Sequence, residues 1–178
     1  MININNLLDF IKPYYASKDI MHNLSHIDNV LKYVEKLLKA GKYEANNDIL
    51  IYSSYFHGVI YNSEQNIIDW LKTQQVSLGM IEKIICVAWE SQKDEVAKTL
   101  EGKILHDAHM IEGGKTYLIV KSLITGSVRG QSLEQTIQYI EDNILGKGIC
   151  YLPEAQAIYS QQQEFAKTFI SDLNEGLK

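Results

Sequence analysis

The sequence predicts an all-α protein. Leu, Ile, Lys, Glu and Gln dominate the 178-residue chain, and all five residue types are tolerated in helices. The two prolines, Pro13 and Pro153, lie near the ends, so nothing in the middle of the chain forbids long helices. Apolar residues recur at helical spacing, for example at Val30, Val34 and Leu37. Together these observations predict a bundle of helices.

Nine helical segments are expected, separated by short breaks and without an internal repeat. Pro13 is expected to end the first and Gly41 the second. The segment 115–125 could instead be a buried strand because β-branched residues are frequent in it, but no other segment offers it a partner strand. The predicted helices cover residues 4–12, 24–40, 44–59, 64–75, 77–92, 101–111, 115–125, 131–145 and 153–176.

The composition limits the size of the fold and its partners. With 46% hydrophobic residues, residues 1–178 can form a single domain around one core. The net charge of −5 argues against binding to a nucleic acid polymer, which needs a basic face. With one arginine, Arg129, phosphate recognition must rely on lysines, a metal or helix N-termini. The sequence contains neither a secretory signal nor a membrane-spanning apolar stretch, so we expect a cytoplasmic protein without membrane contact.

Three polar residues are expected on apolar helix faces, where burial is predicted: His26, His57 and Asp107. An ionised aspartate on such a face is unfavourable unless it is paired, hydrogen-bonded or bound to a cation. Two imidazoles and one carboxylate would suit a transition metal. Their separations of 31 and 50 residues match no short metal motif. Each histidine could therefore be a core residue bonded to a carbonyl, and Asp107 could cap a helix.

Three segments resemble, in order, the motifs of the HD superfamily of metal-dependent phosphohydrolases. They read MHNLSHIDNVLKYV, YSSYFHGVIYN and EGKILHDAHMIEGG. The resemblance extends over residues 20–125 and implies a single-domain helical bundle of the HD type. It also implies that His26, His57 and Asp107 bind a divalent metal, with His57 and Asp107 in the catalytic centre. The metal could be Mn, Mg, Fe, Co, Ni or Zn.

Two positions depart from the family pattern. Gly58 stands where the family has the aspartate of its His-Asp pair, so one anionic ligand is missing. In the third motif His109 replaces a second common acid, and we expect His109 and Glu112 to face solvent or the rim of a cleft. The lost carboxylate should weaken metal binding and could abolish it.

Three further residues could supplement the site. His22 precedes His26 by four residues and could reach the same helix face, or it could lie in an exposed loop. Glu64 could reach back to the metal, or it could cap a helix after Ser63. Lys121 matches a basic residue that the family places near the phosphate, or it could be solvated.

Two functions follow from the resemblance. The first is a phosphohydrolase that uses a metal-activated water on a small phosphorylated molecule, such as a phosphate ester or a nucleotide. The alternative is a catalytically degenerate HD scaffold that binds a ligand or partner. The retained His26, His57 and Asp107 favour the enzyme, whereas Gly58 favours the scaffold.

Overall fold

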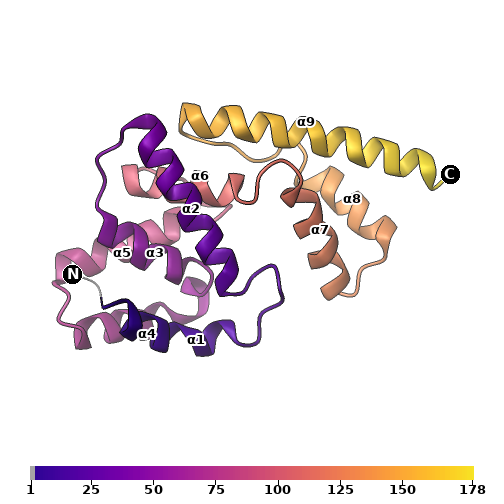
Figure 1. Ribbon diagram of the computed structural model, residues 1–178. Coiled ribbons are helices and arrows are strands. Elements are labelled where there is room, and N and C mark those ends of the chain that lie inside the picture. The colour runs from indigo at the N-terminus through magenta and orange to yellow at the C-terminus, as the bar shows by residue number, and fades with distance from the viewer. Residues whose placement is uncertain (1–2) are drawn as a thin grey trace.

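The computed structural model describes residues 3–178, and every regular element in that range is an α-helix. This confirms the predicted all-α class, and the order of the helices is visible in Figure 1. The helices are α1 (Ile4–Tyr15), α2 (Leu24–Gly41), α3 (Asn47–His57), α4 (Ile60–Thr73), α5 (Leu78–Glu90), α6 (Leu100–Ile111), α7 (Tyr117–Val128), α8 (Leu133–Asn143) and α9 (Pro153–Gly176).

Several predicted helix boundaries differ from the observed ones, by up to four residues, and one open alternative is resolved. Helix α1 continues through Pro13 to Tyr15, although the proline lacks the N–H that would otherwise bond back along the helix. Helix α4 begins at Ile60 rather than at residue 64, so only two residues separate it from α3. The segment 115–125 lies largely within α7 and does not form a strand.

The main hydrophobic core lies among α1 to α6. In it α2 packs on α6 and α3 packs on α5. Phe56, Ile67 and Ile104 are among its fully buried side chains. Burial of such a side chain contributes about 1.5–3 kcal/mol relative to exposure. This core fixes the ends of α2, α3 and α6 relative to one another.

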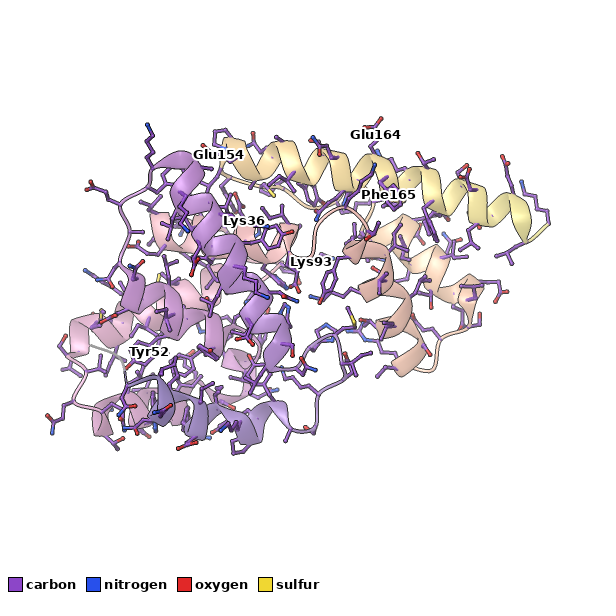
Figure 2. All side chains as sticks on the ribbon, viewed as in Figure 1. Lys36, Tyr52, Lys93, Glu154, Glu164 and Phe165 are labelled. Atoms are coloured by element: carbon purple, nitrogen blue, oxygen red, sulfur yellow. The ribbon has the colours of Figure 1, made fainter. Side chains whose placement is uncertain are left out.

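Helices α7, α8 and α9 form a second group beside this core (Figure 1). The long helix α9 contacts α2 and α6, and it also contacts α7. Ile137, Ile140 and Ile170 form a small cluster that joins α8 to α9. Figure 2 shows Phe165 among the side chains that α9 carries, and the Lys115 Nζ lies 4.9 Å from the centre of its ring.

None of the helices within residues 3–178 combines the length and the apolar character needed to cross a bilayer.

Candidate functional site

Three histidines from three helices converge at one point. His26 lies in the first turn of α2, His57 is the last residue of α3, and His109 lies near the end of α6. One ring nitrogen of each lies within 4.8 Å of the others. The ring centres are 4.3 Å apart for His57 and His109, and 5.3 Å apart for His26 and His109. The predicted meeting of His26 and His57 therefore occurs, with His109 as the third member.

The hydrogen bonds around His57 determine which of its nitrogens is free. The Ser91 hydroxyl donates to the carbonyl of Ala88 at 2.7 Å. A hydroxyl carries one hydrogen, so in the 2.7 Å contact between Ser91 Oγ and His57 Nδ1 the ring must be the donor. The Gln92 amide donates to the carbonyls of His57 and Ala88, which uses both of its hydrogens. The Nε2 of His57 therefore carries the lone pair.

A carboxylate also lies against His26, in an ion-pair contact that lacks the alignment of a hydrogen bond within the described residues. The Nδ1 of His26 lies 2.5 Å from Glu112 Oε2, and a carboxylate can only accept. Glu112 also pairs with Lys121, whose Nζ lies 3.3 Å from the same oxygen. The expectation that Glu112 faces solvent or a cleft rim is wrong, because only 3% of it is exposed. A carboxylate behind an imidazole is a common arrangement in metal sites, where it fixes the ring and raises its basicity.

The third histidine has an unsatisfied nitrogen. Within the described residues, His109 Nδ1 is buried without a hydrogen-bond partner. Burial lowers the pKa of His57 and of His109 well below the usual range, and neighbouring imidazoles and Lys121 add to this. Both rings are therefore neutral at neutral pH, which is the form that binds metals. The expectation that His109 lies outside the site is wrong.

Asp107 does not join this cluster, which corrects its prediction as a metal ligand and catalytic residue. Its carboxylate is fully buried and faces the start of α9. It accepts backbone N–H bonds from Tyr151 at 2.9 Å and from Leu152 at 2.7 Å. The Nδ1 of His106 lies 3.0 Å from its other oxygen. The helix-capping alternative describes its contacts better, although the helix that it supports is α9 rather than its own.

Helix geometry explains why Asp107 and His109 have different surroundings. Successive helical residues are about 100° apart, so residues 107 and 109 point in nearly opposite directions. Asp107 shares its side of α6 with Ile104 and Ile111, which are fully buried. His109 shares its side with Glu112, three residues on. A helical wheel of this segment could therefore have identified His109 as a site residue, because it places His109 on the same side of the helix as Glu112.

The space beside Gly58, where the missing carboxylate would lie, is filled by Tyr15 at the end of α1 and by Lys18, which follows that helix. An ideal Cβ on Gly58 would lie 2.7 Å from the Tyr15 hydroxyl and 3.0 Å from Lys18 Nζ. The Tyr15 hydroxyl donates to the carbonyl of Tyr55, and Lys18 donates to the carbonyl of Gly58 itself. The backbone at Gly58 has φ −76°, which any residue can adopt, so packing alone selects glycine here. A cation thus stands where the family resemblance expects an anion.

Replacement of Gly58 by alanine should therefore destabilise the protein. We expect a loss of about 1–3 kcal/mol in the free energy of unfolding, because the added methyl group meets the buried Tyr15 hydroxyl. Gly79→Ala is the matched control, since a Cβ on Gly79 meets nothing within 4 Å and should stabilise α5 by up to about 1 kcal/mol. Urea denaturation of both variants measures the difference. Equal effects would contradict the close packing at Gly58.

The supplementary residues divide into two groups. His22 and Lys121 line the same cavity as the three histidines. The Nδ1 of His22 is held by Asp19 at 2.8 Å, and its ring centre lies 6.2 Å from that of His26. The prediction that Glu64 reaches the metal site is wrong. Its carboxylate accepts a hydrogen bond from the Trp89 indole at 2.6 Å, and Glu64 is absent from the cavity lining.

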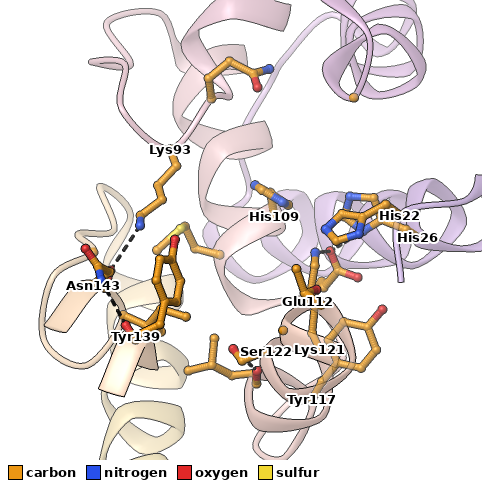
Figure 3. A pocket seen from close by; sticks show the side chains of 18 of the residues that line it. His22, His26, Lys93, His109, Glu112, Tyr117, Lys121, Ser122, Tyr139 and Asn143 are labelled. Atoms are coloured by element: carbon orange, nitrogen blue, oxygen red, sulfur yellow. Dashed lines mark hydrogen bonds and ion pairs between the residues drawn. The ribbon is translucent and has the colours of Figure 1, made fainter. Parts of the chain in front are cut away.

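The histidines open into a cavity of about 390 Å³. Figure 3 shows His22, His26 and Glu112 on one side of it, with Tyr139 and Asn143 across from them. Four cationic side chains line it, while Glu112 is its one acidic lining residue within the described part of the chain. The chain as a whole carries a net charge of −5. This local excess of positive charge favours an anionic ligand. The four cations are those of Lys18, Lys93, Lys121 and Arg129.

Comparisons with known proteins identify the fold. No family model and no curated protein match the sequence. The Lin1889 protein of Listeria innocua is 20% identical with a TM-score of 0.73, and the alignment covers 99% of this chain and 98% of that one. YpgQ of Bacillus subtilis, solved in complex with ADP, is 16% identical with a TM-score of 0.74 over 94% and 96% of the two chains.

A protein of Lactobacillus plantarum is 17% identical to this chain, with a TM-score of 0.78 over 99% of both chains. At such low identity these likenesses show the fold alone. The same arrangement of helices therefore occurs in proteins of these three organisms.

Proposed function

We propose that the protein is a metal-dependent phosphohydrolase of the HD type, acting on a small phosphate ester or nucleotide. One observation carries this proposal: three neutral imidazoles converge in a cavity whose remaining charged groups are mainly cationic. Such a cavity offers ligands for a metal and countercharges for a phosphate.

The residues present fit a divalent metal. His26, His57 and His109 would hold it, and the Nδ1 of His109 is a buried polar atom without a hydrogen-bond partner within the described residues. An all-imidazole set suits Zn, Co or Ni better than Mg, which prefers oxygen ligands. When bound, such a metal lowers the pKa of water and polarises a phosphoryl oxygen.

The chain's own side chains have separate tasks in this proposal. Glu112 keeps His26 oriented, and Ser91 does the same for His57. Lys121 and Lys18 bring positive charge to the histidine end of the cavity, where they would bind and orient the phosphate. The structure of YpgQ in complex with ADP supports a nucleotide as the phosphorylated molecule, since that protein shares the fold.

The second candidate is a degenerate scaffold that binds the same class of ligand without turnover. Gly58 and Lys18 favour it, because position 58 offers no carboxylate and the ammonium group of Lys18 lies beside it. Both candidates predict binding of a phosphorylated molecule. They differ in metal content and catalysis.

One experiment separates the two candidates. Protein purified without chelator is analysed for metal and assayed with an aryl phosphate in the presence of Zn²⁺, Co²⁺, Ni²⁺ or Mn²⁺. About one metal per chain, and turnover that disappears in His57→Ala, would support the hydrolase. Phosphate binding without metal and without turnover for any ion would support the scaffold and overturn the hydrolase.

Lys121 provides an independent prediction about the anion. We expect Lys121→Met to weaken binding of inorganic pyrophosphate about 10- to 100-fold, because a charge-assisted contact is lost. Lys103→Met is the control, since Lys103 lies on α6 and is absent from the cavity lining. Isothermal titration calorimetry measures both variants. Unchanged affinity in Lys121→Met would show that Lys121 serves Glu112 alone.

A further inference from the structure

The cavity extends well beyond the space that a phosphate needs beside the histidines. Its volume of about 390 Å³ lies within the range of sites for small organic ligands. The histidine end is formed by α2, α3 and α6. The opposite end is formed by α8, α9 and the segment between them, and the residues that line it include Tyr139, Asn143, Ile144, Gly148, Tyr159 and Gln163.

The opposite end differs chemically from the histidine end. Its lining from α8 and α9 is aromatic, apolar or amide, and none of these six residues is charged. The ammonium group of Lys93 donates a hydrogen bond to the carbonyl of Asn143 at 3.1 Å. Figure 3 shows Lys93 above Asn143 with this contact dashed. This end therefore suits a neutral, flat group rather than a second phosphate.

Gln163 supplies a donor whose orientation is fixed. Its side chain is 7% exposed, and its Oε1 accepts from the backbone N–H of Gly146 at 2.7 Å. Because a backbone N–H can only donate, the oxygen must face Gly146 and the amide cannot be turned round. This leaves Nε2 buried without a partner within the described residues. A buried donor without an acceptor is unfavourable, so a ligand atom that accepted from Nε2 would relieve this cost.

We propose that the α8–α9 end of the cavity is a subsite for a nucleobase, with Gln163 Nε2 donating to a carbonyl oxygen or ring nitrogen of that base. Tyr139 and Tyr159 lie in the same part of the lining and provide aromatic surface for the ring. The inference rests on the proposed function, because the phosphate joined to this base binds at the histidine end. It narrows the substrate from phosphate esters in general to nucleotides.

The test compares ADP with inorganic pyrophosphate, which has phosphates but no base. Calorimetry gives the dissociation constant of each for the parent and for Gln163→Met. ADP should bind the parent more tightly than pyrophosphate does, and Gln163→Met should weaken ADP about tenfold while leaving pyrophosphate nearly unchanged. Gln163→Glu keeps an oxygen facing Gly146, so it gives the same comparison of ligands if the methionine variant does not fold.

The outcomes separate the subsite from the proposed function. If the parent binds pyrophosphate as tightly as ADP, or if Gln163→Met weakens both ligands equally, the base subsite is wrong and the phosphate site stands. If the parent binds neither ligand, with or without added Zn²⁺, both the subsite and the proposed function are wrong.

Discussion

Replacement of Asp107 by alanine should lower the free energy of unfolding by about 3 kcal/mol. Its carboxylate accepts the backbone N–H groups of Tyr151 and Leu152 where the chain enters α9. Leu152 has no side-chain cap of its own for this helix, so nothing else in the described chain takes over these bonds. The variant would leave the buried N–H of Leu152 unpaired, and it would also remove the acceptor of the partly buried N–H of Tyr151. For a chain of this length the melting temperature should fall by roughly 6–12 °C.

Two further variants show whether the loss of stability is specific to the carboxylate of Asp107. Asp69→Ala removes an exposed aspartate of α4 and should change stability by less than about 0.5 kcal/mol. Asp107→Asn keeps one acceptor oxygen and should lose less stability than the alanine variant. It should also bind Co²⁺ as tightly as the parent does, since Asp107 lies outside the histidine cluster. If the folded Asp107→Asn protein no longer bound Co²⁺, Asp107 would be a metal ligand after all.

Replacement of His109 by alanine should nearly abolish metal binding. Loss of a partner that only orients a ligand typically weakens metal affinity about 10- to 100-fold, and loss of one of three direct ligands should weaken it more. Titration with Co²⁺, followed by its absorption spectrum, measures the affinity. Stability should change little without metal, because the variant also removes the buried, unpaired Nδ1.

His106→Gln is the matched control for this experiment. His106 lies on the same helix and is also buried, but its ring faces Asp107 and the Tyr151 ring rather than the cluster. We expect its metal affinity to equal that of the parent while the protein is folded. If His109→Ala bound Co²⁺ as tightly as His106→Gln does, the three-histidine site would be wrong.

The cavity beside the three histidines has an excess of positively charged side chains. Two of the three positions at which the resemblance expects acids near the metal carry other groups, glycine at 58 and histidine at 109, and the third, Asp107, lies outside the histidine cluster. Lys18 stands beside Gly58, and its pKa is lowered by burial. The ligand set is therefore neutral rather than anionic, which should weaken metal binding and strengthen phosphate binding relative to a carboxylate-rich site.

The sequence by itself determined the helices. Their existence follows from apolar spacing and from the absence of internal breakers, which act over a few residues. His26 and His57 were also identifiable, because each is a polar residue on a face that the apolar pattern predicts to be buried. The nine predicted segments accordingly overlap the nine helices of the described chain. The errors lie at the helix ends, as at Pro13, where α1 continues to Tyr15.

Only the tertiary structure decided which polar groups meet. Asp107 and His109 are two residues apart, and the approach of α9 on one side of α6 and of α2 and α3 on the other assigns them opposite roles. The contact of Lys18 with Gly58 joins residues 40 positions apart. Such contacts depend on how helices pack, and packing is set by the shape of a whole core rather than by any local pattern of residues.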